Sequence, residues 1–183
     1  RNTDLNVFIT KLIHYRWLMK LQISRSNTLI FISESYRKNM EDNFKELYLK
    51  ANKIKVISNA VDDFWIENNI LTDTDKVIRE DVLLYVGGFN KNKNLKGIVL
   101  SAIKSKEKFP GLKLLLVGGT SDELREITGI DNIPFFIEVL GRVNSKYDLL
   151  NLYRSAKVFM MPSFFETFGL VYIEALLQGC SII

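Results

Sequence analysis

The sequence predicts an α/β fold: a Rossmann-like parallel sheet covered by helices on both faces. Two observations lead to this prediction. From Val82 onward, short apolar runs alternate with segments of helical period, an order typical of parallel sheets. The apolar runs are almost continuous, and several end in glycine or Pro-Ser. Strands buried on both faces have that composition, and the turns after them favour such residues.

The predicted elements follow one another in a regular order. Strands are expected over 82–88, 112–119, 135–143, 157–163 and 180–183, with helices over 94–109, 123–127, 146–156 and 170–179 between them. The carboxyl ends of parallel strands meet at one edge of the sheet, and open α/β sheets bind their ligands there. We therefore look for functional residues in the loops that follow the strands.

The first 58 residues show a different pattern. They have a helical period to about Lys50, interrupted by a strand-like run over Thr28–Ile32, and Ser33 has the properties of an N-cap for a helix beginning near Glu34. A second short apolar run covers Ile54–Ile57. We interpret residues 1–58 as the end of one domain, 59–80 as a polar linker and 81–183 as an incomplete α/β domain.

Composition excludes several classes of protein. The 183 residues are 47% hydrophobic and 25% charged, as in folded globular domains. The only cysteine, Cys180, permits no internal disulfide, which favours a reducing compartment and a cytoplasmic location. No apolar run approaches the roughly 20 residues that span a bilayer. The chain lacks an initial Met and ends in a strand-like segment, so we expect a piece of a larger protein.

The charge pattern leaves one question open. The net charge is +4, and early basic residues such as Arg16 and Lys20 are interleaved with Trp17 and Leu18. Such a helix suits peripheral contact with an anionic membrane surface, but a solvated basic face on an ordinary amphipathic helix is the simpler interpretation. No nucleic-acid-binding motif and no zinc-ligand cluster is present. We interpret His14, the only histidine, as a packed or surface residue.

The loop after the first strand has the chemistry of an anion site. Gly87 and Gly88 allow the backbone to approach a ligand closely, and Lys91 and Lys93 add positive charge beside a helix N-terminus. These features suit a phosphate or diphosphate. The three-glycine dinucleotide fingerprint and the Walker pattern are absent. The alternative is an ordinary Gly- and Asn-rich turn with solvated lysines.

Two glutamates near the end of the chain need separate explanations. Ser163 and Glu166 have the spacing of a capping box, so Glu166 either caps a helix or binds sugar hydroxyls at the sheet edge. Glu174 lies within an apolar helix that we expect to be buried nearly all round, where a carboxylate needs a partner. A vicinal diol of a ribose or a distant Lys or Arg would each supply one.

These motifs together resemble a known family. The pattern ETFGLVYIE, residues 166–174, is similar to the two glutamates, separated by seven residues, of the retaining glycosyltransferases of family 4, which have the two-domain GT-B fold. Further similar segments lie in the family's order: residues 53–62, 83–95, 139–143, 152–163 and 174–179. The resemblance implies the donor-binding half of such an enzyme, with residues 59–80 as the interdomain hinge and residues 1–58 as the end of the acceptor domain.

The resemblance also implies roles. Lys93 would neutralise the diphosphate of a UDP- or GDP-linked sugar donor without a metal ion or other cofactor, and Glu166 would hold the sugar hydroxyls. Glu174 would bind the ribose, and the main chain near Arg142 and Val143 would meet the base. The implied donor-binding residues are Gly87, Gly88, Lys93, Arg142, Val143, Glu166, Thr167, Phe168, Gly169, Leu170 and Glu174. The acceptor would be a glycan or a lipid-linked sugar.

One departure from the family keeps other functions open. Gly88 stands where the family commonly has an arginine, so diphosphate binding is weakened unless Lys91 replaces that charge. A non-catalytic subunit that binds nucleotide-sugars is therefore one alternative. Another GT-B enzyme, such as a nucleotide-sugar epimerase or a phosphorylase, is the other.

Overall fold

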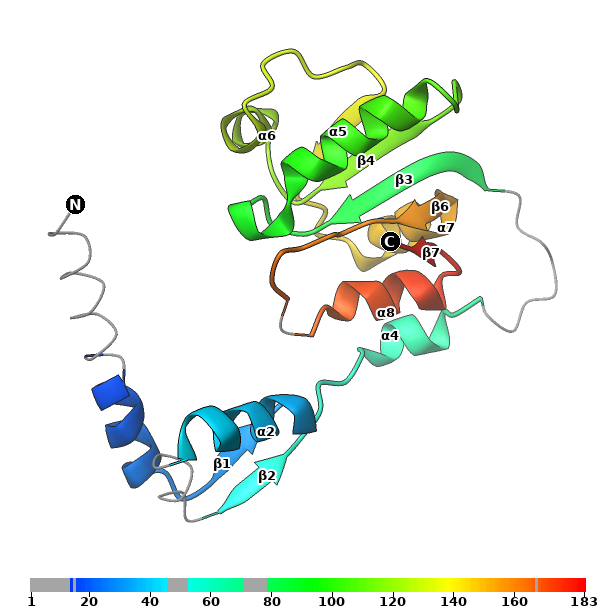
Figure 1. Ribbon diagram of the computed structural model, residues 1–183. Helices are drawn as coiled ribbons and strands as arrows, with labels where there is room; N and C mark the ends of the chain where they lie inside the picture. Colours follow the sequence, from blue (N-terminus) through cyan, green and yellow to red (C-terminus); the bar gives the residue numbers. More distant parts are fainter. Residues whose placement is uncertain (1–13, 15, 46–52, 71–78, 167) are drawn as a thin grey trace, which may run out of the picture. The chain divides into compact units, whose positions relative to one another are not determined.

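The computed structural model describes residues 14, 16–45, 53–70, 79–166 and 168–183 (Figure 1). The chain divides into two compact units, Arg1–Ala60 and Val61–Ile183. Each unit is described by itself.

The first unit contains a helix over residues 16–25, strand β1 (Leu29–Phe31), helix α2 (Glu34–Asn43) and strand β2 (Ile54–Val56). The two strands pair in parallel. Ser33 caps α2 as predicted, because its side chain accepts a hydrogen bond from the Tyr36 amide at 3.1 Å. Ile23, Phe31 and Met40 are the buried hydrophobic residues among those described in this unit.

The second unit is built on one five-stranded sheet (Figure 1). Its strands are β3 (Glu80–Val86), β4 (Lys113–Val117), β5 (Ile137–Gly141), β6 (Ala156–Phe159) and β7 (Ser181–Ile182). Its helices are α4 (Asp63–Glu67), η1 (Lys91–Lys93), α5 (Leu95–Lys106), α6 (Ser121–Thr128), α7 (Lys146–Ser155) and α8 (Leu170–Leu177). All strand pairs are parallel, in the order β5-β4-β3-β6-β7. The predicted parallel sheet is confirmed.

Helices cover both faces of this sheet (Figure 1). α5 and α6 pack together on one face, and α7, α8 and α4 lie on the other. The side chains between the layers are fully buried, including Leu84, Leu114, Ile98 and Phe159. The near-continuous apolar strands are explained by this double cover, because neither face of a central strand meets water.

The strand order places a topological switch point between β3 and β6. β3 connects through α5 to β4 on one side, whereas β6 connects through α8 to β7 on the other. Loops that leave the two central strands therefore diverge at the carboxyl edge and leave room between them, which is where open α/β sheets bind ligands.

Two expectations differ from the structure. Within the segment 59–80 that we interpret as a linker, α4 is folded, and its Trp65 is 3% exposed and part of the hydrophobic core. The aromatic pair Phe64-Trp65 explains why this polar stretch packs. Nor is α8 buried nearly all round: of its residues only Ala175 is buried, and Leu176 is 46% exposed. One side of α8 meets the sheet, while the apolar side chains elsewhere on it are only partly covered.

Candidate functional site

The loops after β3 and β6 are joined to each other. In the first loop, the Asn90 side chain caps η1 by accepting a hydrogen bond from the Asn92 amide at 3.0 Å. The Asn92 carbonyl in turn accepts a hydrogen bond from the Phe164 amide, at 2.8 Å, in the second loop. Backbone pairing thus holds the two loops side by side at the switch point.

Lys93 and Glu166 meet at this junction. The Lys93 ammonium donates to Oε2 of Glu166 in an ion pair, and the two side chains are only 19% and 26% exposed. η1 carries the lysine and the loop before α8 carries the glutamate, 73 positions later. Partial burial makes this pair more strongly coupled than an ion pair in open solvent.

Two tyrosines brace the loops around this pair. The Tyr85 hydroxyl donates to the Gly88 carbonyl at 3.0 Å, and the Tyr172 hydroxyl donates to the Met161 carbonyl. Burial first, and then the negative charge of Glu166, raises the pKa of both phenols above the ordinary value of 10. Both hydroxyls therefore remain protonated donors at neutral pH, and they fix the backbone of each loop.

Glu174 does not touch the Lys93–Glu166 pair in the bonds described. Its Oε2 accepts a hydrogen bond from the buried Tyr153 hydroxyl at 3.1 Å. Burial raises the pKa of Glu174, an effect that the Tyr153 hydrogen bond opposes. Asp62 and Lys146, which pair with each other at 2.6 Å, lie close enough to affect this pKa in opposite directions. The hydrogen-bond partner of Glu174 is therefore the Tyr153 phenol, and neither a lysine nor an arginine.

The capping-box interpretation of Glu166 is not supported. α8 begins at Leu170, and its N-cap is Gly169, which has no side-chain cap. Glu166 thus lies before the helix entry and pairs with Lys93 instead. Gly169 is required there: its φ is +70°, and a Cβ would lie 2.5 Å from the Tyr172 ring and 3.2 Å from Cγ of Glu166.

The remaining predicted residues lie at the same carboxyl edge. Gly87 and Gly88 follow β3, and Arg142 and Val143 follow β5. Arg142 is exposed, whereas Val143 packs partly against the core. The half-buried segment 168–170 leads into α8. Thr167 lies outside the described residues.

The glycines of this edge allow the strand ends to approach closely. A Cβ on Gly118, which has a φ of +121°, would lie 2.2 Å from the Gly87 carbonyl oxygen. At Gly88, by contrast, a Cβ would meet nothing within 4 Å. The position of the family's arginine is therefore open space. Lys91 is exposed and borders a separate hollow with Lys96 and Phe164.

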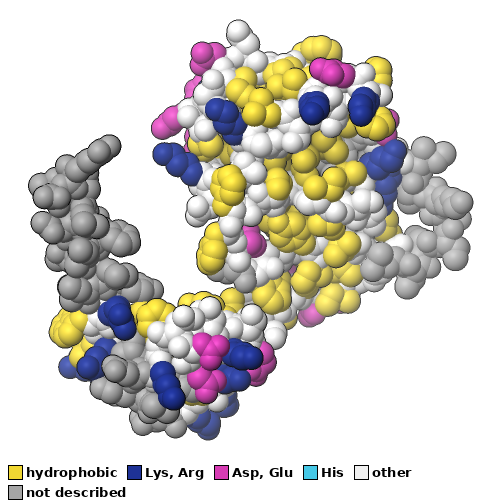
Figure 2. All heavy atoms as spheres, viewed as in Figure 1, with side chains coloured by type: hydrophobic (Ala, Val, Ile, Leu, Met, Phe, Trp, Pro, Cys, Tyr) yellow, Lys and Arg dark blue, Asp and Glu magenta, His cyan; other side chains and the backbone are white. Residues whose placement is uncertain are grey.

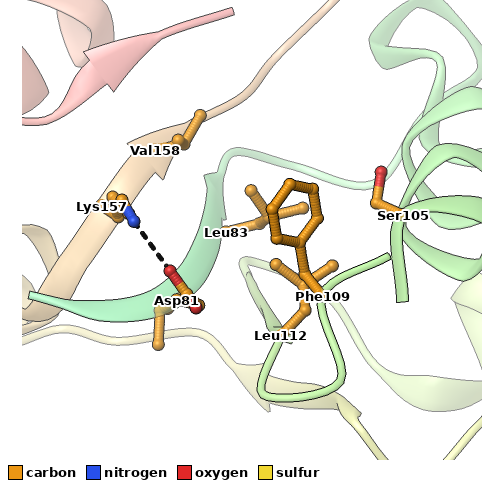
Figure 3. Close-up of a pocket in the computed structure, with 8 residues that line it drawn as sticks. Asp81, Leu83, Ser105, Phe109, Leu112, Lys157 and Val158 are labelled. Atoms are coloured by element: carbon orange, nitrogen blue, oxygen red, sulfur yellow. Dashed lines mark hydrogen bonds and ion pairs between the residues drawn. The ribbon is translucent and has the colours of Figure 1, made fainter. Parts of the chain in front are cut away.

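Two further features bear on ligand chemistry. In the part of the chain described, no three His, Cys, Asp or Glu side chains come together to hold a metal ion. A cavity of about 190 Å³ lies at the opposite, amino edge of the sheet, where Leu83, Phe109 and Val158 line it beside the Asp81–Lys157 ion pair (Figure 3). It is apolar and lies away from the edge where such folds bind ligands.

Surface charge is dispersed on the face shown in Figure 2. Lysine and arginine side chains are scattered among hydrophobic and acidic ones on its described residues, without the single basic stripe of nucleic-acid-binding surfaces. His14 is exposed. None of the described helices combines the length and apolarity needed to cross a bilayer.

Sequence reasoning missed the tyrosines of the site. Tyr85 lies in an apolar run and Tyr153 in a segment of helical period, so both look like ordinary core residues. Tyr172, three positions after Gly169, offers a weak signal, because an aromatic ring over a glycine explains why no larger residue is present there.

The fold and this edge define the class of protein. It is an α/β protein with a Rossmann-like sheet, whose charged pair lies where this architecture binds nucleotides. Residues 66–183, more than half of the chain, match the family model described as glycosyl transferases group 1, and the chain belongs to that family.

Curated relatives agree with this assignment. The chain is 34% identical over 84 residues to a D-inositol 3-phosphate glycosyltransferase of Mycobacteroides abscessus, which covers 43% of this chain and 18% of that protein. It is 30% identical over 104 residues to an O-antigen chain mannosyltransferase B of Escherichia coli, which covers 55% and 27%. The chain therefore spans well under half the length of these relatives.

Solved structures show the same fold at low identity. The pneumococcal O-GlcNAc transferase GtfA, solved with UDP and GlcNAc, has a TM-score of 0.68 at 21% identity and covers 88% of this chain and 31% of its own. The structure of TarM has a TM-score of 0.67 at 17% identity, with 92% and 31% covered. The fold is that of GT-B glycosyltransferases over part of their chains.

Proposed function

We propose that the full-length protein is a retaining glycosyltransferase of family 4 that transfers a hexose from a UDP- or GDP-linked donor to a glycan or lipid-linked acceptor in polysaccharide biosynthesis. The observation that carries this proposal is the half-buried Lys93–Glu166 pair at the switch point. A single cation and a single carboxylate, held by braced loops, match the two ends of a sugar diphosphate: one end is anionic and the other carries hydroxyl donors.

Lys93 has the central role. Its ammonium stabilises the charge that develops on the diphosphate as the sugar–phosphate bond breaks, and a preorganised cation in such a site lowers the barrier by several kcal/mol. The backbone at Gly87 and Gly88 allows the phosphates to approach. Glu166 accepts hydrogen bonds from the donor sugar, and the main chain of residues 167–170 surrounds it.

Glu174 and the loop after β5 hold the nucleoside. A carboxylate kept half-buried with one phenol partner retains lone pairs for the two hydroxyls of a ribose. The main chain at Arg142 and Val143 supplies polar groups for the base. Both features support a nucleoside diphosphate as the shared part of the donor.

No metal ion is needed in this proposal, because Lys93 supplies the positive charge. The test is transfer by the full-length protein in the presence of excess EDTA. Activity lost with EDTA and restored by Mg²⁺ or Mn²⁺ would contradict metal independence, and NMR of the anomeric product checks retention.

A cytoplasmic location at the inner membrane face completes the proposal. In the helix over residues 16–25, Trp17 and Leu18 are 57% and 37% exposed beside Arg16 and Lys20, which suits an anionic lipid surface. Co-sedimentation with phosphatidylglycerol vesicles is the measurement. Equal recovery with neutral phosphatidylcholine vesicles would remove the electrostatic part of the argument.

The main experiment combines binding and turnover. UDP, GDP and ADP are titrated into the full-length protein by calorimetry, and transfer from the matching nucleotide-sugars is then measured. We expect binding of one nucleotide and a loss of about 100-fold or more in turnover for Lys93→Ala. Absence of binding to all three nucleotides would overturn the proposal.

The open space at Gly88 favours one alternative, a non-catalytic subunit that binds nucleotide-sugars. Such a protein binds the donor but shows neither transfer nor donor hydrolysis. Turnover that Glu166→Gln or Lys93→Ala abolishes would exclude it. Product analysis with labelled donor separates transfer from epimerisation and phosphorolysis.

A further inference from the structure

We propose that the hollow bordered by Lys91 and Phe164 binds an anionic saccharide, so that the acceptor of the transferred sugar carries a carboxylate or a phosphate. This inference rests on the proposed function and narrows the acceptor that it names. The hollow has a volume of about 290 Å³. It is lined by Lys91, Asn94, Leu95, Lys96, Gly97, Ile127 and Phe164.

The hollow shares its two loops with the Lys93–Glu166 pair. Lys91 and Asn94 stand on either side of Lys93 in the chain, and Phe164 stands two positions before Glu166. The backbone hydrogen bond that the Phe164 amide donates, at 2.8 Å, holds the two loops together. The charged pair itself does not line the hollow. A molecule bound in the hollow therefore lies beside the proposed donor site, on the side from which an acceptor can approach.

The charge of the hollow favours an anion. Lys91 and Lys96 each contribute an exposed ammonium group, and no carboxylate lines the hollow. Within the described parts of the chain, neither lysine takes part in a salt bridge. A concave surface lined by charge of one sign, with apolar walls beside it, attracts a ligand of the opposite charge.

Asn94 places a carboxamide in the same hollow. Its φ of 52° lies in the left-handed region, and its side chain makes no capping hydrogen bond to α5. A Cβ on Gly97 would lie 2.6 Å from Oδ1 of Asn94, so the glycine makes room for this side chain. Glycine weakens a helix, and residues with a side chain disfavour the left-handed region. The chain thus accepts two unfavourable local features where the carboxamide, which can both donate and accept, meets the hollow.

The apolar part of the hollow favours a saccharide over a bare anion. Phe164 is 75% exposed although its amide is fixed by the hydrogen bond between the loops. Its ring, with Leu95 and Ile127, gives the hollow apolar walls. The C–H groups on one face of a sugar ring pack against such a surface, while the hydroxyl and acidic groups reach the amide and the ammonium groups. Sites for small organic ligands combine apolar walls with a few polar groups in this way.

The test compares matched ligands on the full-length protein, with its donor site filled by the nucleoside diphosphate that it prefers. NMR titrations measure the affinities for methyl glucuronide, methyl glucoside 6-phosphate, neutral methyl glucoside and inorganic phosphate. We expect both anionic glucosides to bind about tenfold more tightly than the neutral one, because two ammonium groups face them. Inorganic phosphate should bind more weakly than the glucoside phosphate, because it has no ring to pack on Phe164. Comparison of the glucuronide with the glucoside phosphate tells which acidic group is preferred.

Two variants test the charge and the ring separately. Lys96→Gln is expected to weaken both anionic glucosides about threefold and to leave the neutral glucoside unchanged. Its control is Lys104→Gln, which removes the same charge from an exposed position in the last turn of α5. Phe164→Ala is expected to weaken all three glucosides about fivefold and inorganic phosphate not at all. Its control is Phe135→Ala, which removes a 91% exposed ring before β5, at the other edge of the sheet.

The outcomes separate this inference from the proposed function. Absence of binding to UDP, GDP and ADP overturns the proposed function and the acceptor assignment with it. Where a nucleotide binds, four results overturn the inference alone: no glucoside binds, the neutral and anionic glucosides bind equally, inorganic phosphate binds as tightly as the glucoside phosphate, or each variant behaves like its control. Thermal unfolding reports whether each variant is folded, and unchanged nucleotide affinity of Lys96→Gln shows that the hollow is distinct from the donor site.

Discussion

Gly88 is the residue at which this chain departs from the family pattern that it otherwise resembles. The structure leaves open space around its Cα, and its φ is not in the left-handed region. A larger side chain is therefore sterically acceptable. Glycine at position 88 leaves the site without the positive charge of the family's arginine, although the backbone there does not require a glycine.

Gly88→Arg is expected to tighten the binding of UDP or GDP, whichever the wild type prefers, by about tenfold, since a charge-assisted hydrogen bond contributes about 1.5–3 kcal/mol. Calorimetry at two salt concentrations measures the gain and its electrostatic character. Gly88→Gln is the control, because it adds length without charge. Equal affinity of the arginine and glutamine variants would show that no phosphate comes near position 88.

Glu174 illustrates a conflict between stability and binding at a single residue. Its pKa in the folded protein is raised above 4.5 by burial. A raised carboxyl pKa means that the folded state prefers the protonated form, so the ionised form lowers stability above the unfolded pKa. This penalty disappears as the pH falls below about 4.5.

Glu174→Gln keeps the acceptor for Tyr153 and removes the charge. We expect the free energy of unfolding to rise by up to about 1 kcal/mol at about pH 7.5 and to stay unchanged at about pH 4, the small size reflecting solvent screening of a half-exposed group. Urea unfolding at both values is the measurement, with Glu126→Gln as the control. A loss of stability at the higher pH would contradict the sign of this argument.

The ends of several elements are held together by Arg79, at the amino edge of the sheet. Its Nη1 donates to the Ala156 carbonyl at 2.7 Å and to that of Tyr153 at 3.2 Å, and its Nη2 donates to the Gln178 carbonyl at 2.5 Å. One guanidinium thus satisfies carbonyls from the ends of α7 and α8 and the start of β6. Arg154 adds a bond to the Asn68 carbonyl after α4.

Arg79→Ala is expected to lower the free energy of unfolding by about 2–4 kcal/mol, because the bonds from the guanidinium to three carbonyls are lost at once. Arg79→Lys should recover only part of the loss, since an ammonium lacks the fork geometry that reaches all three. Lys157→Ala, which breaks an exposed ion pair with Asp81, is the control and should change stability by less than about 1 kcal/mol. Chemical denaturation that gives the same small change for Arg79 and Lys157 would refute the role of Arg79.

At the scale of the whole molecule, the chain contains two units with separate hydrophobic interiors. The large core cluster runs from Trp65 to Cys180, and none of the described residues before Val61 belongs to it. The first unit buries Phe31 and Met40 instead. Each unit therefore has buried hydrophobic side chains of its own.

Core truncations should act on one unit at a time. Leu114→Ala, fully buried in β4, is expected to destabilise the second unit by about 2–5 kcal/mol, and Phe31→Ala the first by about 3–5 kcal/mol. Hydrogen exchange followed by mass spectrometry locates each effect. Loss of protection spread evenly across both units in either variant would contradict their independence.

The order and type of elements were determined by the sequence alone. Continuous apolar runs and helical periods are local signals, so each predicted strand and helix after Val82 has its counterpart, although β6 ends at Phe159 rather than Ser163. From that order, the sequence also predicts that the loops with these glycines and glutamates lie at the carboxyl edge of the sheet. The match to glycosyl transferases group 1 confirms the resemblance to glycosyltransferases, while membership of family 4 and retention stay predictions.

Only the tertiary structure decided which side chains are partners. Lys93 and Glu166 are 73 positions apart, Tyr153 and Glu174 are 21 apart, and Arg79 reaches Gln178 across 99. Such contacts depend on the strand order, which brings β6 beside β3, and on which face each helix covers. Both result from the packing of the whole unit, so the residues around either partner carry little sign of the other.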